Sequence, residues 1–133
     1  MILVDSSVWI DFFRGLSTPQ TDKLDELFDS EEFGVGDLVL TEVLQGCKLD
    51  KELNDVRRLL SRLEFVVLGG DDVAVEAARN YRKLRSLGVT VRGTVDVVLA
   101  TRCIVSGHQL LRSDRDFDPF EQHLGLRCVG TAA

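Results

Sequence analysis

Short apolar runs alternate along the chain with longer segments in which apolar residues recur every three or four positions. The short runs are the strand candidates, namely Ile2–Val4, Glu32–Gly36, Glu64–Gly70, His108–Leu111 and Gly125–Val129. Short runs bounded by turn residues, such as the β-branched one at the start, are typical of strands buried on both faces.

The longer segments have the periodicity of amphipathic helices. Leu53, Val56, Leu60 and Leu63, for example, fall on one face of a helix. Serine, aspartate and glycine residues at the ends of the segments supply start and stop signals. The expected helices are one that Ser6 or Ser7 caps and that carries Val8–Phe13, then Thr21–Asp29, Leu38–Gln45, Lys51–Arg62, Asp71 to a stop at Gly88, and Thr94–Ser106.

The regular alternation of strands and helices predicts an α/β fold in three layers. Helices cover both faces of a parallel sheet in such folds, and the crossovers are right-handed. The chain has 133 residues and shows no internal repeat, linker or low-complexity stretch. We therefore expect a single domain over residues 1–133.

Composition narrows the possible settings. Apolar residues make up 44% of the chain, and no apolar run approaches the ~18 residues of a membrane span. The first residues do not resemble a signal peptide, so we expect a cytoplasmic protein without membrane association. The formal net charge of −6 disfavours binding to nucleic acid unless a basic patch or metal ions assist. Cys47, Cys103 and Cys128 form no metal or disulfide pattern and are expected to be small buried residues.

Acidic residues follow the predicted strands. Asp5 ends the first strand, Asp114 follows the fourth, and Asp96 opens the helix that precedes the fourth. Glu42 lies among apolar residues of the helix after the second strand, where a carboxylate needs a partner. Because functional residues of parallel α/β folds gather beyond the carboxyl ends of the strands, we expect these four acids to meet there.

Helix capping explains other aspartates of the chain. Asp37, Asp71 and Asp72 are expected to be helix starts only. Asp96 also fits the first turn of a helix, whereas Asp5 has Ser6 and Ser7 beside it to do the capping.

Crowded carboxylates cannot all ionise unless a cation neutralises them. Oxygen ligands without histidine or cysteine suit a hard ion such as Mg²⁺ or Mn²⁺, and the implied chemistry is metal-assisted hydrolysis of a phosphate ester. A calcium loop is rejected, because Pro119 and Gly125 stand where that motif needs Gly and Glu. Asp114 and Asp116 remain candidate ligands, and Asp118 is expected to cap the next turn.

Four segments in register resemble a PIN domain, and more narrowly a bacterial VapC-type toxin of a type II toxin–antitoxin pair. They comprise "ILVDSSVWIDFF", "LTEVLQG" and the two motifs within "VRGTVDVVLATRCIVSGHQLLRSDRDFDPF". The resemblance implies a five-stranded parallel sheet in the order 3-2-1-4-5. It implies metal ligands at Asp5, Glu42, Asp96 and Asp114, with Asp116 a lesser candidate.

The same resemblance implies a Mg²⁺- or Mn²⁺-dependent endoribonuclease that forms a homodimer and is inhibited by a VapB-type antitoxin. Many members of this family have Thr where this chain has Arg112. Either Ser113 takes over the hydroxyl contact, or Arg112 touches the phosphate of the RNA. The residues expected to bind RNA are Arg92, Arg112 and Arg115, and those expected beside the metal ligands are Ser6, Ser7 and Ser113.

Two other classes share parts of this pattern. A receiver-type signalling domain also has acids at strand ends, but it expects an acidic pair after the first strand and a Lys at the end of the fifth. Ser6 follows Asp5, and "GLRCVG" contains no Lys. A non-catalytic PIN-like binding domain is the other alternative, although such domains tend to lose an acid.

Overall fold

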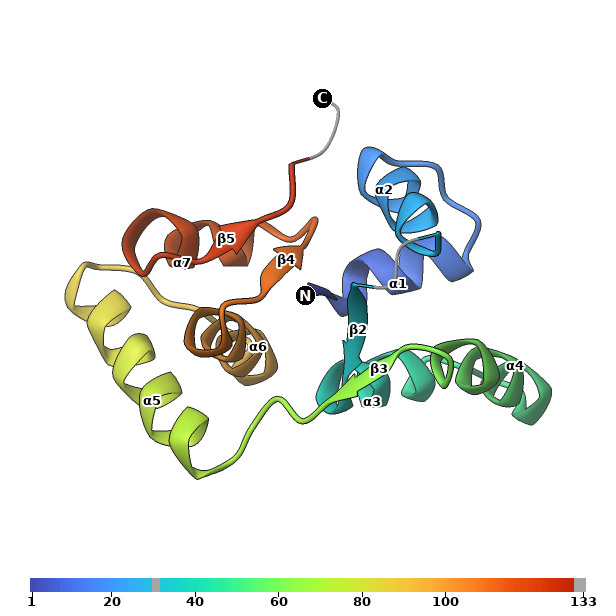
Figure 1. Ribbon diagram of the computed structural model, residues 1–133. Coiled ribbons are helices and arrows are strands. Elements are labelled where there is room, and N and C mark those ends of the chain that lie inside the picture. Colours follow the sequence, from blue (N-terminus) through green and yellow to red (C-terminus); the bar gives the residue numbers. More distant parts are fainter. Residues whose placement is uncertain (30–31, 131–133) are drawn as a thin grey trace.

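The computed structural model describes residues 1–29 and 32–130, and its five strands form one parallel sheet in the order β3-β2-β1-β4-β5 (Figure 1). The strands are β1 (Ile2–Val4), β2 (Phe33–Gly36), β3 (Glu64–Val66), β4 (Gln109–Leu111) and β5 (Arg127–Cys128). The predicted α/β class, parallel pairing and strand order are confirmed. Residues 30–31 and 131–133 of the expected domain lie outside the described part.

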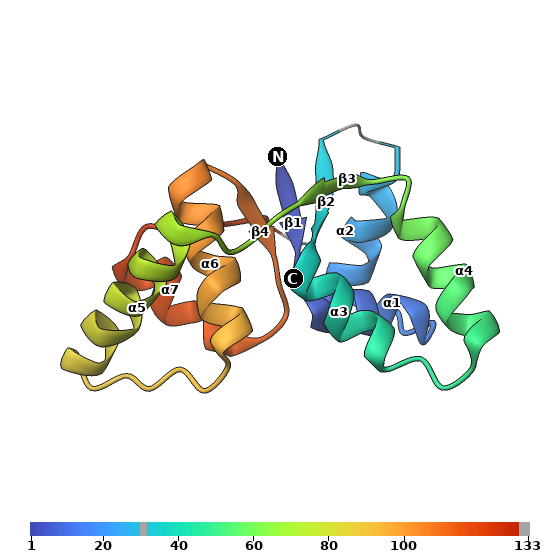
Figure 2. The ribbon, with the colours of Figure 1, turned by 90° about the horizontal axis from the view of Figure 1, so that it is seen from below.

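The helices lie in two groups. They are α1 (Ser6–Phe13), α2 (Pro19–Leu27), α3 (Asp37–Gln45), α4 (Asp50–Leu60), α5 (Asp71–Ser86), α6 (Thr94–Ser106), the 3₁₀ turn η1 (Arg115–Phe117) and α7 (Asp118–His123). Figure 2 shows α1–α4 on one side of the strands and α5–α7 on the other. The three-layer arrangement expected from the sequence is therefore present.

Two helical elements, η1 and α7, do not follow from apolar periodicity, because they are only three and six residues long. The second helix also begins earlier than predicted. Thr18 and Thr21 form a reciprocal capping box around Pro19, which starts the helix two residues before Thr21.

Strand β3 ends at Val66, within the Glu64–Gly70 segment that the sequence predicted to form a strand and a turn. Side chains hold the backbone there in place of a neighbouring strand. The Asp37 carboxylate accepts a hydrogen bond of 3.0 Å from the Leu68 N–H. Arg102 donates to the Leu68 and Gly69 carbonyl oxygens at 3.0 and 2.6 Å. Asp37 thus does more than start α3.

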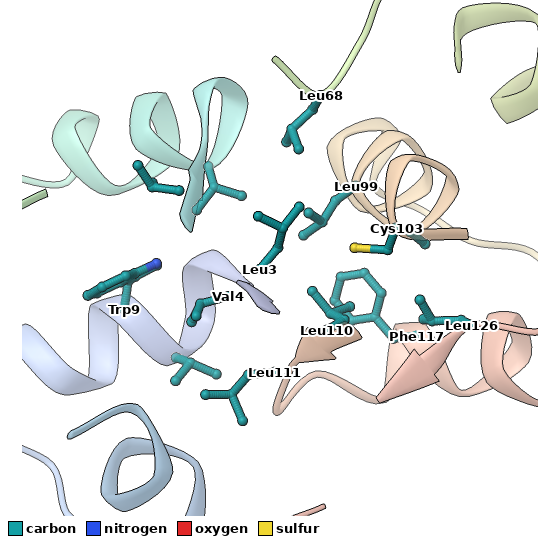
Figure 3. Close-up of a cluster of buried hydrophobic side chains, with 14 of the residues drawn as sticks. Leu3, Val4, Trp9, Leu68, Leu99, Cys103, Leu110, Leu111, Phe117 and Leu126 are labelled. Carbon is teal, nitrogen blue, oxygen red and sulfur yellow. The ribbon is translucent and has the colours of Figure 1, made fainter. Parts of the chain in front are cut away.

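The core is centred on β1 and β4, which pair in register from Ile2–Gln109 to Val4–Leu111. Leu3, Leu110 and Leu111 are fully buried. Since successive side chains of a strand point to opposite faces, this pair contributes to the core on both sides of the sheet. Figure 3 shows these side chains packed among residues from both groups of helices, including Trp9, Leu99 and Phe117.

Burial of the cysteines agrees only in part with the prediction. Cys103 is fully buried, but Cys47 and Cys128 are half-buried. Within the described ranges, no helix is both long enough and apolar enough to cross a membrane.

Close packing between β2 and β3 predicts that Gly34 is intolerant of a side chain. A Cβ atom at Gly34 would lie 2.7 Å from the Glu64 carbonyl oxygen and 2.9 Å from the Met1 sulfur. We expect Gly34→Ala to lower the free energy of unfolding by about 1–3 kcal/mol, because the backbone of β3 must move. Urea denaturation measures this.

Gly69→Ala is the matched control. A Cβ atom there would meet nothing within 4 Å, so we expect a change below about 0.5 kcal/mol. Equal stability of the two variants would contradict the close approach of β2 and β3.

Candidate functional site

Asp5 lies where β1 passes into α1 and is only 2% exposed. Its backbone N–H donates to the Leu111 carbonyl oxygen at 2.9 Å, which ties it to the end of β4. The Ser7 hydroxyl donates to its carboxylate. Burial raises the pKa of Asp5 above its ordinary value and Asp114 adds to the rise, while the Ser7 hydrogen bond opposes it. No positively charged group among the described residues offsets the effect of burial on the pKa of this carboxylate.

Asp114 follows the end of β4 by three residues and caps η1. Its carboxylate accepts a hydrogen bond of 2.9 Å from the Asp116 N–H. The Ser113 hydroxyl lies 2.9 Å from the Ser7 hydroxyl, so the segments that follow β4 and β1 are joined by side chains. This contact places Ser7 and Ser113 beside the acids, as expected for supporting residues.

The tightest group of acids joins two separate segments. One carboxylate oxygen from each of Asp96, Asp114 and Asp116 lies within 4.8 Å of the other two. Asp96 comes from the first turn of α6, whereas the other two flank the start of η1. These atoms are close enough together for a single ion to bind all three.

Electrostatics links the remaining acids to this group. The pKa of Asp96 is raised to about 7, first by burial and then by the charges of Asp5, Asp114, Glu42 and Asp116. Each of these carboxylates therefore makes it harder for Asp96 to ionise. The charges of the other three expected acids and of Asp116 thus all reach Asp96 at the carboxyl edge of the sheet.

Glu42 is half-buried on α3, and its Oε1 atom has no hydrogen-bond partner among the described residues. The indole N–H of Trp9, on the neighbouring helix α1, is likewise unpaired there. A buried polar atom without a partner costs on the order of 1–3 kcal/mol. An unpaired carboxylate oxygen that acts on other carboxylates has the chemistry of a ligand for a cation.

The residues present fit a divalent ion. Across the described ranges, no lysine, arginine or histidine forms an ion pair with any of the five acids. Oxygen donors alone, crowded and partly buried, favour a hard cation such as Mg²⁺ or Mn²⁺. Asp96, Asp114 and Asp116 would hold the ion, and Asp5 and Glu42 would complete its surroundings.

Asp116 lies within this group, although the sequence made it only a lesser candidate. The sequence placed Asp5, Glu42, Asp96 and Asp114 first, whereas the closest group contains Asp116 and leaves Asp5 and Glu42 outside it. The spacing of two residues between Asp114 and Asp116 was the available signal. In a 3₁₀ turn capped by Asp114, this spacing brings both carboxylates together.

The three arginines that the sequence predicts to bind RNA differ in exposure and in ion pairing. Arg92 and Arg115 are exposed. Arg112 instead forms an ion pair with Asp118, with 2.5 Å between Nη2 and Oδ1. Asp118 was expected only to cap the following turn, so its pairing with Arg112 was missed.

Other basic and aromatic groups behave as ordinary structural residues. Arg58 and Arg79 form exposed ion pairs with residues three positions earlier on their own helices, which is typical of a solvated helix face. Trp9 is fully buried and stacks against Phe13 and Phe33, as a core residue does.

Comparison with known proteins agrees with the fold and with the geometry of the site. The family model described as PIN domain matches residues 2–121. Ribonuclease VapC11 of Mycobacterium tuberculosis and VapC ribonuclease Mb1587 of Mycobacterium bovis are each 31% identical over 134 residues. Each alignment covers 97% of this chain and 98% of the relative.

Solved structures share the fold at lower identity. VapBC2 from Rickettsia felis, bound to a DNA fragment from its promoter, matches with a TM-score of 0.77 and 17% identity, covering 97% of this chain and 98% of that one. DNA-bound VapBC from Salmonella typhimurium matches with a TM-score of 0.75 and 17% identity, covering 96% of each chain. From the family match and the relatives that align along almost its whole length, the chain belongs to the PIN-domain family.

Proposed function

We propose that this protein is a divalent-metal-dependent endoribonuclease that acts as the toxin of a VapBC-type toxin–antitoxin pair in the cytoplasm. The observation that carries the proposal is the meeting of Asp96, Asp114 and Asp116 beside Asp5 and Glu42 at one edge of the sheet. Relatives named as VapC ribonucleases, aligned over 97% of the chain, support the activity.

The partners follow from the same relationships. The solved structures that share the fold include complexes named VapBC, which supports a VapB-type antitoxin as the partner of this chain. We further propose that the toxin is a homodimer and that its substrate is RNA.

The carboxylates have separate tasks in the proposed reaction. Asp96, Asp114 and Asp116 would hold the ion, and the Ser7 hydroxyl holds the Asp5 carboxylate in one orientation. When bound, Mg²⁺ or Mn²⁺ lowers the pKa of a coordinated water and stabilises negative charge at phosphorus. In-line attack by water with departure of the 3′ oxygen leaves 5′-phosphate and 3′-hydroxyl ends.

Neither histidine of the chain is placed to act as the general base. His108 precedes β4, and its Nδ1 lies 3.3 Å from the N-terminal nitrogen of Met1. This is the amino edge of the sheet, opposite to the acids. His123 ends α7 and lies beside Ile104 and Val105 near the carboxyl end of α6, whereas Asp96 lies in the first turn of that helix. Proton removal is thus left to the acidic centre.

The strand order distinguishes one of the two alternative functions from the proposed one, but not the other. A receiver-type domain has the strand order 2-1-3-4-5, whereas this sheet has the order 3-2-1-4-5, which rules that alternative out. A non-catalytic PIN-like domain shares the fold, so activity measurements distinguish it from an enzyme.

Loss of one ligand is expected to abolish activity. Expression of the wild-type chain in a bacterial host should arrest growth and give discrete new RNA 5′ ends. Asp96→Asn should do neither, because removing a carboxylate weakens the metal centre. Co-expression of the neighbouring antitoxin gene should relieve the arrest.

Purified protein gives the matching test. Asp96→Asn should cleave RNA at least about 100-fold more slowly than the wild type, and excess EDTA should stop the wild type. Asp71→Asn, an exposed change at the start of α5, is the control and should keep full activity. Undiminished cleavage by Asp96→Asn, or by the wild type in EDTA, would rule out this mechanism.

Arg92 and Arg115 are proposed to contact the RNA phosphates. Both are exposed and neither forms an ion pair with a described residue. Arg92 also lines a cavity of about 510 Å³ with Arg82 and Tyr81, between α5 and α6. Charge reversal at Arg92 or Arg115 should raise KM for RNA and reduce its salt dependence, with kcat less affected. An unchanged KM would remove that residue from the substrate site.

The raised pKa of Asp96 makes the metal-free protein sensitive to pH. Its carboxyl group takes up a proton more readily in the folded chain than in the unfolded one, where the ordinary value is 3.8. The free energy of unfolding of the metal-free protein therefore falls progressively as pH rises from about 4 to about 7. Asn cannot ionise, so Asp96→Asn escapes this loss.

In EDTA, the Tm of Asp96→Asn should exceed that of the wild type at pH 8, and the gap should shrink towards pH 4. Added Mg²⁺ should raise the Tm of the wild type more than that of the variant, because a ligand that binds only the folded state stabilises it. A Tm gap that does not vary with pH would contradict the charge crowding at Asp96.

A further inference from the structure

The segment between β4 and α7 carries Asp114 and Asp116, and one ion pair closes it. Arg112 is the first residue after β4, and Asp118 is the first residue of α7. Their Nη2 and Oδ1 atoms are 2.5 Å apart, so the pair joins the two ends of a loop formed by residues 113–117.

Arg112 is also bound inside this loop. Its Nη1 donates to the Asp114 carbonyl oxygen at 3.4 Å, and its side chain interacts with the Cys128 thiol of β5. The guanidinium therefore connects β4, η1, α7 and β5. A phosphate group would have to displace these contacts to use it.

This ion pair is less exposed to solvent than the three pairs that join residues of a single helix. The Arg112 side chain is 19% exposed and that of Asp118 is 39% exposed. The Arg58–Asp55 pair on α4 has 74% and 55% exposure and a separation of 3.9 Å. Exposed pairs of the latter kind contribute little, because water and salt screen them.

The loop has little freedom once its ends are joined. Phe117 is fully buried in the core, and the Asp114 carboxylate accepts from the Asp116 N–H. The backbone from Arg115 to Phe117 is a single 3₁₀ turn. Asp114 begins this turn, so the position of its backbone carbonyl affects the separation of the Asp114 and Asp116 carboxylates. Arg112 holds that carbonyl in place.

We propose that Arg112 is a positioning residue of the metal centre, which sets the arrangement of Asp114 and Asp116 through Asp118 and the Asp114 carbonyl. This inference rests on the proposed function and assigns Arg112 to the metal site, not to RNA binding. The residues that hold metal ligands in place commonly change metal affinity by 10–100-fold when they are replaced.

The test measures Mn²⁺ binding to the full chain without RNA, by isothermal titration calorimetry. Arg112→Met keeps the aliphatic stem and removes the charge, and Asp118→Asn removes the opposite charge at nearly the same size. Each should weaken Mn²⁺ binding by about tenfold. The double variant should bind no more weakly than the single ones, because both changes break one interaction.

Arg58→Met is the matched control, since it breaks an exposed ion pair outside the acidic centre, and it should leave Mn²⁺ affinity unchanged. Additive losses in the double variant would overturn the ion-pair mechanism. Unchanged Mn²⁺ affinity in Arg112→Met, with a raised KM for RNA, would overturn it in favour of a phosphate contact.

A measurement in EDTA separates this inference from the proposed function. Hydrogen exchange at the Asp116 amide should be about tenfold faster in Arg112→Met than in the wild type, because the loop opens more often. The exchange rate in Arg58→Met should match that of the wild type. If the wild type binds no metal, the proposed function fails, whereas equal exchange rates at Asp116 would refute the positioning role of Arg112.

Discussion

Parallel pairing of β1 with β4 is the contact on which the rest of the molecule depends. Leu3 and Val4 lie in register with Leu110 and Leu111, and all four are buried. Because the strands are parallel, their carboxyl ends arrive at the same edge. Hydrophobic packing therefore brings together Asp5 and the loop that carries Asp114. This packing does not depend on the charges of the two aspartates.

The acids at that edge oppose the packing that brings them together. Burial and mutual repulsion disfavour ionisation of Asp5 and Asp96, and Glu42 retains a buried oxygen without a partner among the described residues. The Ser7 hydroxyl offsets part of this cost at Asp5. Such local conflict within an otherwise consistent fold is characteristic of functional sites.

Much of this arrangement could be predicted from the sequence, because the informative features are local. Apolar runs and helical spacing give the alternation of elements, and acids directly after strands can be assigned to the carboxyl edge. The contacts that hold the turn after β3 could not be seen, since they come from Asp37 and Arg102, which are distant in the sequence. The pairing of Arg112 with Asp118 depends on how η1 turns the chain, and three residues are too few to show a period.

Strand pairing over such distances also affects synthesis of the chain. β1 leaves the ribosome before β4, and more than a hundred residues separate these two neighbouring strands. Translation proceeds from the amino end, and contacts between distant segments form only when both are present. The acidic centre is consequently absent from every nascent chain that ends before β4 and η1. A ribosome that makes this protein would be exposed to its activity only after β4 and η1 have both been synthesised.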